Sequence, residues 1–243
     1  MVETRIGFRR TQFPNQVDIE QIGPASKEEL CHLLEDAKNV MGKSSCVHTR
    51  VTVCLEDKGY DTLHSLLIDH GYDLFARKYL FRKQLADELQ LPSHYRWENI
   101  GMGETDEKTF SYIWKSCMSQ SANRTSTRSI EEQLNDVRAL LGENWRLSCR
   151  IVYQDETPVA MTIPHLEPGR EKEGRIYYIG TLPSARGKGL GQIVHAASLK
   201  MLNEMGAAVY EGSTHAENVP MQRVFEKNGC TVTGKIATYY KGL

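Results

Sequence analysis

The sequence predicts an α+β fold, because strand-like and helix-like segments alternate along it. Residues 175–182 are rich in β-branched and aromatic side chains and end at a proline, and residues 190–202 carry apolar side chains at helical spacing. A second strand-like run follows at 207–214, and the same alternation occurs before residue 90. The 243 residues are enough for one large or two small domains, each with its own core.

The turn between the first of these strands and its helix is rich in glycine. Residues 186–191 have the sequence Arg-Gly-Lys-Gly-Leu-Gly. Such a turn leaves several backbone N–H groups unpaired at the positive end of the helix dipole, and glycine lets a phosphate approach without a Cβ in the way. We interpret the turn as a cradle for a diphosphate; an ordinary glycine-rich connection is the alternative.

Two other phosphate-binding patterns fit this turn poorly. The Walker A pattern requires Ser or Thr after its lysine, whereas Gly189 follows Lys188. The dinucleotide fingerprint Gly-x-Gly-x-x-Gly fails because Gly187, Gly189 and Gly191 alternate strictly. An α/β protein that uses the turn for a different phosphate ligand stays open as an alternative.

The turn resembles the acetyl-CoA motif of the GNAT superfamily of N-acetyltransferases. That motif runs Arg/Gln-x-x-Gly-x-Gly/Ala after an apolar-x-Pro element, which here is Thr-Leu-Pro at 181–183. Farther along, Asn218 precedes a helix-like segment that carries Phe225, and Lys227-x-Gly229 follows, which is similar to the second GNAT signature. The two signatures stand in the family's order, and the resemblance covers about residues 95–243.

The resemblance implies a complete GNAT domain at 95–243, with a mixed, mostly antiparallel central sheet and helices on both faces. The remaining segments fit that order. We expect a strand at 97–100, helices at 105–119 and 129–141, a hairpin at 147–153 and 158–163, and a polar loop at 167–174.

The resemblance also implies acetyl-CoA as the co-substrate and no metal. The pantetheine arm is expected where the central strand separates from its parallel neighbour, and the diphosphate on the amides of the turn. Asn218 would bind near the pantetheine or only hold its own helix, and Lys188 would contact phosphate or solvent. The implied donor-binding residues are Ile179, Gly180, Thr181, Leu182, Arg186, Gly187, Lys188, Gly189, Leu190, Gly191, Asn218 and Phe225.

The implied reaction is transfer of an acetyl group to a primary amine by direct attack in a ternary complex. A protein or histone acceptor would favour a long acidic run, and the sequence has none, so we expect a small-molecule amine. Phe225 stands where the family often has a tyrosine acid, and Arg175 where some members have a carboxylate. A catalytically weak CoA-binding or regulatory protein is therefore the alternative.

Several residues are candidates for moving protons during the transfer. We expect catalytic roles for His215, Tyr178 and Glu173, and further proton relays at His165 and Glu211. A proton could reach the CoA thiolate from water or from Tyr210, Tyr239, Tyr240 or Cys230. Strand alternation predicts that Tyr177 and Tyr178 point to opposite faces, so that one of them borders the acceptor.

The segment 1–90 is expected to be a partial, degenerate copy of the same fold. Its strands at 16–24, 49–55 and 72–83 alternate with helices at 26–34 and 61–70. The spacing agrees with an internal repeat, since Gly71 to Lys83 and Gly229 to Lys241 are both 12 positions. An unrelated small α/β domain is the alternative, and a linker is expected at 91–94.

The N-terminal copy is predicted to bind no CoA. Where a cradle would lie, the chain has no glycine triplet and instead has the carboxylates of Glu28 and Glu29. Ser26 and Glu29 have the spacing of a capping box, which would occupy the first amides of the following helix.

Composition limits the other classes of function. A formal net charge of −1 gives no basic patch for nucleic acid or a membrane surface, and no apolar run reaches membrane-spanning length. The start of the sequence has no apolar signal region, and the six cysteines show no Cys-x-x-Cys pair, so we expect reduced thiols in a cytoplasmic protein. We expect a monomer or a homodimer.

Overall fold

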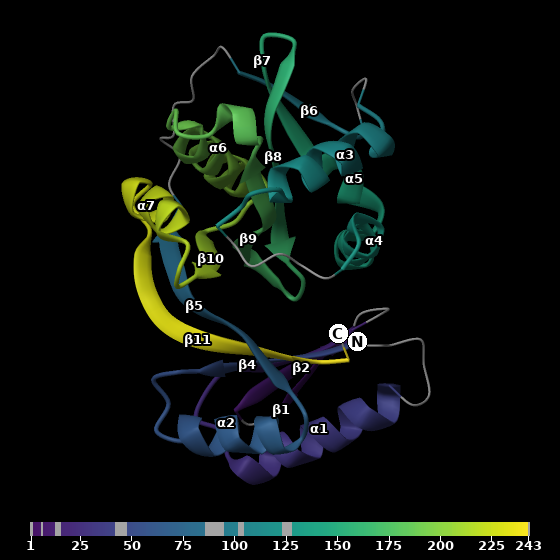
Figure 1. The fold of residues 1–243 in the computed structure, drawn as a ribbon, viewed down its shortest axis with the longest axis vertical. Helices are drawn as coiled ribbons and strands as arrows, with labels where there is room; N and C mark the ends of the chain where they lie inside the picture. The colour runs from purple at the N-terminus through teal and green to yellow at the C-terminus, as the bar shows by residue number, and fades with distance from the viewer. Residues whose placement is uncertain are drawn as a thin grey trace. The chain divides into compact units, whose positions relative to one another are not determined.

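The structure is a computed structural model, and it describes residues 2–5, 7–12, 16–41, 48–85, 95–101, 105–122 and 128–242. The chain forms two compact units (Figure 1). Unit one consists of residues 1–80 and 233–243, and unit two of residues 81–232. The C-terminal strand thus belongs to the same unit as the N-terminal segment.

Unit one is a sheet covered by two helices that lie on the same face (Figure 1). Its strand order is β1-β2-β3-β4-β11-β5, with β3 parallel to β4 and β11 antiparallel to β4. The elements are β1 (Val2–Arg5), β2 (Phe8–Gln12), β3 (Gln16–Gln21), α1 (Lys27–Met41), β4 (His48–Cys54), α2 (Tyr60–Asp69), most of β5 (Asp73–Gln84) and most of β11 (Thr231–Lys241).

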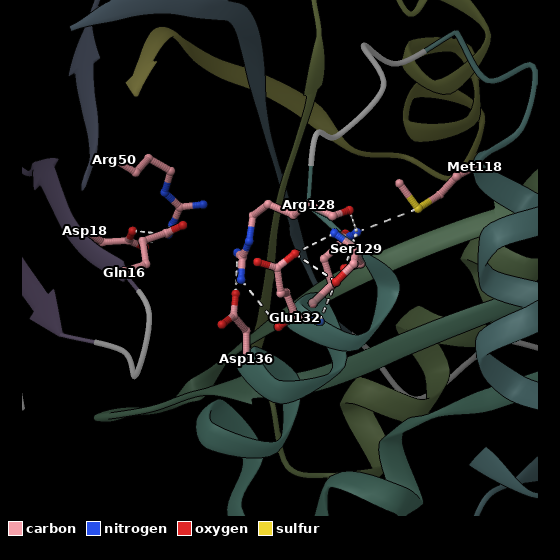
Figure 2. Close-up of polar contacts among 9 residues, drawn as sticks. Gln16, Asp18, Arg50, Met118, Arg128, Ser129, Glu132 and Asp136 are labelled. Carbon is pink, nitrogen blue, oxygen red and sulfur yellow. Dashed lines mark hydrogen bonds and ion pairs between the residues drawn. The ribbon is translucent and has the colours of Figure 1, made fainter. Parts of the chain in front are cut away.

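The two faces of the unit-one sheet differ in chemistry. Residues of β4 alternate between buried and half-buried, so Val51 and Val53 join the core under the helices. Asp18 and Arg50 are register partners on β3 and β4 and form an ion pair, with Gln16 donating to the same carboxylate (Figure 2). Burial raises the pKa of Asp18 more than Arg50 lowers it. On one face of this sheet Asp18, Arg50 and Gln16 thus hold one another by polar contacts, whereas the face under the helices is apolar.

Unit two is a five-stranded mixed sheet in the order β10-β9-β8-β7-β6, antiparallel except for the parallel pair β9 and β10. The end of β5 also lies in this unit, beside β10. The elements are β6 (Tyr95–Asn99), α3 (Glu107–Met118), α4 (Ile130–Leu141), η1 (Gly142–Asn144), α5 (Trp145–Ser148), β7 (Arg150–Gln154), β8 (Thr157–Glu167), β9 (Arg170–Thr181), η2 (Pro183–Ala185), α6 (Leu190–Glu204), β10 (Val209–His215) and α7 (Val219–Lys227).

Helices pack on both faces of this sheet. Ile151 and Met161 join a core with Trp114 of α3, whereas their neighbours Val152 and Ala160 join a second core with Val194 of α6. Period-two alternation along β7 and β8 therefore supplies one apolar layer to each face. The predicted mixed, mostly antiparallel sheet with helices on both faces is confirmed.

Two local predictions were wrong. The segment 167–174 is no polar loop: β8 and β9 form a tight hairpin through Pro168 and Gly169, the latter at φ 77°. The predicted strand at 147–153 begins only at Arg150, because a short helix buries Trp145 against the core of α3 and α4 first. In both places tertiary pairing and packing prevail over local polarity and β-propensity.

Strands β3, β4 and β5 and helices α1 and α2 agree with the prediction, as does the capping box of Ser26 and Glu29, whose two hydrogen bonds are 3.1 and 3.2 Å. Strands β1 and β2 were not predicted. The degenerate-copy interpretation and the division at 1–90 and 95–243 stay predictions. The expected linker at 91–94 lies outside the described residues.

Two lysines at matching positions give further support to the repeat. At the end of β5, Lys83 Nζ lies 2.6 Å from the carbonyl oxygen of Asn228, which ends α7 in unit two. At the end of β11, Lys241 Nζ lies 2.5 Å from the carbonyl oxygen of His70, which ends α2 in unit one. A cation at a helix C-terminus satisfies open carbonyls and complements the helix dipole. The last strand of each predicted copy thus caps a helix of the other copy.

Within the described residues, the helices are too short or too polar to cross a bilayer.

The C-terminal strand β11 supplies core side chains to unit one, so removing one of these side chains should destabilise that unit. Tyr239 is fully buried and its hydroxyl bonds to Tyr60 at 3.1 Å and to His64 at 2.8 Å. We expect Tyr239→Ala to lower the free energy of unfolding by about 3–5 kcal/mol, as for other buried aromatics. Val232→Ala is the control on the same strand, because Val232 is 51% exposed. Urea unfolding that gave equal losses for both variants would contradict this packing.

Candidate functional site

The central feature of unit two is a wedge between the parallel strands β9 and β10. The strands pair only where Val209 meets Glu173 and Tyr210 meets Gly174. Beyond that point β9 continues to Thr181 and β10 to His215 with no further pairing in the described structure. Backbone N–H and C=O groups on the facing edges therefore need other partners. An extended polar chain that lies in the wedge would supply them.

The equivalent pair in unit one is closed. Strands β3 and β4 pair at five successive positions, from Gln16 with His48 to Glu20 with Thr52. Just past them, the side chain of Gln21 accepts from the amide of Cys54 at 2.8 Å and donates to Asp57 at 2.8 Å. Backbone pairing and this side chain fill the space that is open in unit two.

The cradle lies at the wide end of the wedge, between η2 and α6. Gly187 and Gly189 have φ of 78° and 77°, and Gly189 is the N-cap of α6 without a side-chain cap. In the described structure the amides of residues 187–191 make no hydrogen bond, while the next amide, that of Gln192, bonds to the carbonyl oxygen of Gly189 at 3.1 Å. A Cβ at Gly187 or Gly189 would meet nothing within 4 Å, so glycine is needed there for the left-handed backbone. Several free amides therefore face open space at a helix N-terminus, which suits an anion.

The Arg186 side chain makes structural hydrogen bonds. Its guanidinium donates to the carbonyl oxygens of Cys117, Ser119 and Gln120 at 2.9, 2.8 and 2.6 Å, and to that of Thr181 at 3.3 Å. These carbonyls are the open C-terminal acceptors of α3 and the end of β9. The side chain thus fastens α3 to the base of the cradle. The local sequence gives no signal of this role, because the three acceptors at the end of α3 lie more than 60 residues away.

Lys188 is the exposed cation of the cradle. It also borders a cavity of about 280 Å³ beside η2. The other lining residues are Tyr95, Gln154, Asp155, Thr157, Val159, Ser184, Ala185 and Leu190.

A β-bulge places two tyrosines on the same side of β9. Ile176 pairs with Pro164 and Ile179 with Thr162, so β9 has one residue more than β8 between these points. The rings of Tyr177 and Tyr178 both lie near Trp114 of α3, with centroids 6.1 and 5.4 Å away. The prediction of opposite faces was wrong, because the bulge interrupts the alternation.

Tyr178 lies over Gly180, two residues farther along β9. A Cβ at Gly180 would lie 2.7 Å from the Tyr178 hydroxyl and 3.0 Å from Cβ of Cys117, so this position accepts only glycine. Burial raises the pKa of Tyr178, and burial also raises the pKa of Cys117 to about 12. Both groups are protonated at neutral pH on the α3 side of the wedge.

The start of α4 is fixed by polar contacts on the α3 side (Figure 2). Ser129 and Glu132 form a complete capping box. The guanidinium of Arg128 donates to the buried carboxylate of Asp136 at 2.5 Å. Residues 123–127, which precede α4 in the chain, lie outside the described structure.

Glu173 lies at the closed end of the wedge, where it forms ion pairs. Its carboxylate contacts Arg170 at 3.0 Å and Arg175 at 2.6 Å. Burial raises the pKa of this carboxyl, but the two guanidiniums outweigh burial and the net pKa is lowered. Arg175 also contacts Glu211 at 3.5 Å, and Arg82 contacts Glu211 at 2.7 Å. The ion pairs with the two arginines thus make the Glu173 carboxylate a weaker base.

His215 and Asn218 shape the start of α7. The carbonyl oxygen of His215 accepts from the amide of Asn218 at 3.0 Å and from the Gln222 side chain at 3.2 Å. The buried side chain of Asn218 accepts from the amide of Met221 at 3.1 Å as the N-cap of α7. Of the two roles expected for Asn218, the structure shows the one that holds its own helix.

Phe225 belongs to an aromatic cluster under α7. Its ring stacks on Phe81 with a centroid distance of 4.4 Å and meets the edge of His195 at 5.0 Å. Burial lowers the pKa of His195 to about 3, and burial lowers the pKa of His165 to about 4. Both histidines are neutral at pH 7.

The chain belongs to the acetyltransferase (GNAT) family, a class that the open wedge and the free amides of the cradle already indicate. The family model matches residues 107–230, just over half of the chain. Membership implies acyl transfer from acetyl-CoA. No curated protein matches the sequence.

Solved structures share the fold over nearly the whole chain. A GCN5-related N-acetyltransferase from Kribbella flavida is 14% identical with a TM-score of 0.65 and covers 99% of this chain and 89% of its own. One from Sphaerobacter thermophilus is 13% identical with a TM-score of 0.62, covering 97% and 76%. A tandem GNAT protein from the clavulanic acid biosynthesis pathway is 15% identical with a TM-score of 0.59, covering 96% and 78%.

Arg186 is expected to contribute to stability. Arg186→Ala should lower the free energy of unfolding by about 2 kcal/mol, since it leaves several carbonyls without a charged donor. Arg186→Lys should restore only part of the loss, because an ammonium lacks the planar fork of donors. Exposed Arg223→Ala serves as the control. Equal urea midpoints for all three variants would contradict the contacts described.

Buried His165 should make the protein sensitive to mild acid. Its pKa lies near 4 when folded against 6.5 when unfolded, so the unfolded state binds more protons between these values. The stabilisation is complete above pH 6.5 and is lost as pH falls towards 4, with a slope of at most about 1.4 kcal/mol per pH unit from one group. His195 acts with the same sign.

His165→Gln should make the dependence of unfolding free energy on pH shallower in that range. His32→Gln, an exposed site on α1, is the control. Urea unfolding at a series of pH values measures both, and an unchanged slope in His165→Gln would count against burial of a neutral imidazole.

Proposed function

We propose that the protein is an acetyl-CoA-dependent N-acetyltransferase that acetylates a primary amine of a small molecule by direct attack in a ternary complex. The observation that carries this proposal is the wedge of β9 and β10 with the unbonded amides of residues 187–191 at its mouth. A pantetheine arm matches the open strand edges, and a diphosphate matches the amides.

The donor would lie along one continuous path. The pantetheine amides would pair with β9 at Ile179, Gly180, Thr181 and Leu182, and the diphosphate would meet the amides of Gly187, Lys188, Gly189, Leu190 and Gly191. Lys188 would supply the positive charge, because Arg186 is engaged with carbonyls. Asn218 and Phe225 would act indirectly, as the cap of α7 and as packing beneath it. Backbone N–H groups of the bulge could polarise the thioester carbonyl.

Among the candidates for proton transfer, His215 keeps the strongest case as a base acting through water. It is half-buried at the open end of β10, whereas Glu173 is ion-paired at the closed end. Tyr178 has a protonated hydroxyl on the α3 side, and we propose that it borders the acceptor amine.

We further propose one donor site per chain. In unit one, three features oppose a second site: the paired strands β3 and β4, the link from Gln21 to Cys54, and the capping box that uses the first amides of α1. In addition, the carbonyl oxygen of Gly7 accepts from the amide of Ile22 at 2.9 Å, and Gly7 packs against Pro24 and Ala25. Unit one would therefore support the fold without binding CoA.

The second candidate function is CoA binding with little or no turnover. Two features favour weak turnover: the packed ring of Phe225 has no proton to donate, and the Glu173 carboxylate is held in an ion pair with Arg175. Both candidates share the donor site and differ only in catalysis.

A donor-binding and turnover experiment tests these proposals. Calorimetry with acetyl-CoA should give one site per chain, and Gly189→Glu should weaken binding at least about 100-fold, because like charges about 4 Å apart repel by several kcal/mol. Gly169→Glu is a matched control, since Gly169 has the same φ of 77° and equally open surroundings but lies in the β8–β9 turn.

Release of free CoA thiol is then measured with polyamines, amino acids, aminoglycosides and peptides. Turnover with a small amine supports the acetyltransferase. Binding without turnover on any amine selects the second candidate, and equal binding by wild type and Gly189→Glu would refute the donor site itself.

A further inference from the structure

Tyr210 stands at the apex of the wedge. It is the last residue of β10 that pairs with β9, opposite Gly174. Its ring is 2% exposed and packs on the α6 and α7 side, with centroids 5.3 Å from His195 and 6.2 Å from Phe225. It therefore lies beside the residue that occupies the position of the family's usual tyrosine.

The ring of Tyr210 runs along β10 towards the open part of the wedge. A Cβ at Gly212 would lie 2.1 Å from the Tyr210 hydroxyl and 2.6 Å from its Cζ, so only glycine fits there. Residues 210 and 212 share one side of the strand, and the hydroxyl thus lies over a residue that no longer pairs with β9. Gly212 gives the hydroxyl its space in the same way as Gly180 does for Tyr178.

The hydroxyl makes no hydrogen bond to another described residue, and it is not one of the fully buried polar atoms that lack a partner. It can therefore donate to a ligand atom in the wedge. By comparison, the hydroxyl of Tyr239, another buried tyrosine, bonds to Tyr60 and His64.

The surroundings keep this hydroxyl protonated. Burial raises the pKa of Tyr210, nearby Cys230 adds to the rise, and Arg175 opposes it only in part. Burial raises the pKa of the neighbouring Cys230 thiol to about 11, so a thiolate formed in this space is a stronger base than in water. The phenol therefore carries its proton at neutral pH and can donate it when a basic thiolate forms beside it.

We propose that Tyr210 is the general acid of the transfer reaction and supplies from β10 the hydroxyl that Phe225 lacks on α7. This inference rests on the proposed acetyltransferase function. The C–N bond forms as the C–S bond breaks, and the electron pair of that bond stays on sulfur. The phenolic proton moves to the sulfur to give free CoA thiol. The amine releases one proton, and water carries it to the phenolate. No further reactant is needed.

The test is kcat for CoA release by Tyr210→Phe, which removes only the hydroxyl. We expect kcat to fall roughly 100-fold, the scale of one general acid, while acetyl-CoA binding is unchanged. Tyr72→Phe is the matched control, because it removes the hydroxyl of a buried tyrosine in unit one that bonds to Thr49; it should lower stability and leave kcat unchanged. Tyr210→Phe combined with Phe225→Tyr should regain most of the lost kcat, since the second change returns a hydroxyl from α7.

The outcomes distinguish failure of the proposed acetyltransferase function from failure of the acid role of Tyr210. If wild type binds acetyl-CoA but acetylates no amine, the acetyltransferase function fails and Tyr210 has no acid role. If wild type turns over and Tyr210→Phe keeps its kcat, Tyr210 is not the acid and the acetyltransferase stands. A loss in Tyr210→Phe that Phe225→Tyr does not repair assigns the tyrosine to packing.

If circular dichroism shows that Tyr210→Phe does not fold, 3-fluorotyrosine is incorporated at position 210 instead. This residue keeps the ring and carries a more acidic hydroxyl. A changed kcat with unchanged acetyl-CoA affinity would then support the proposal. An identical kcat and pH profile would overturn it.

Discussion

The separation of β9 from β10 is the constraint on which the rest of unit two depends. Two parallel strands that stop pairing after Gly174 leave backbone N–H and C=O groups on their facing edges without a strand partner. The cradle at 186–191, the bulge at Tyr177 and Tyr178, and the cap that Asn218 gives to α7 all lie around this opening. Arg186 adds mechanical support, because it ties the end of α3 to the turn that forms the cradle.

Unit one is predicted to be a partial copy of these elements, and its corresponding strands are closed. Helices α1 and α6 both have 15 residues and strands β4 and β10 both have 7, yet β3 and β4 remain paired along their length. Each site feature has a replacement: Gln21 bonds across the strand ends, and Glu29 caps the helix that would otherwise bind an anion. Lys83 and Lys241 then cap α7 and α2 in a matching way.

Much of the fold could be predicted from local pattern. Helices α1 and α2, strands β3, β4 and β5, and the caps at Ser26 and Ser129 agree with the sequence prediction, because periodicity and capping depend on neighbouring residues. Strands β1 and β2 were not predicted. The errors at 147–153 and 167–174 arose where burial of Trp145 and hairpin pairing decided the backbone. The Tyr-x-Gly pattern at 178–180 and 210–212 is visible in the sequence, but its meaning depends on how each ring folds over its glycine.

The sequence by itself determined the family and the place of the cradle, since alternating glycines at a helix start dictate a left-handed backbone and free amides locally. Only the tertiary structure decided what the neighbouring side chains do. Arg186 meets carbonyls from a distant helix, and Glu173 meets Arg170 and Arg175 at the closed end of the wedge. The bulge places Tyr177 and Tyr178 on one side, and Tyr210 reaches the wedge over Gly212. These contacts join residues whose proximity depends on strand register and packing, which no short stretch of sequence specifies.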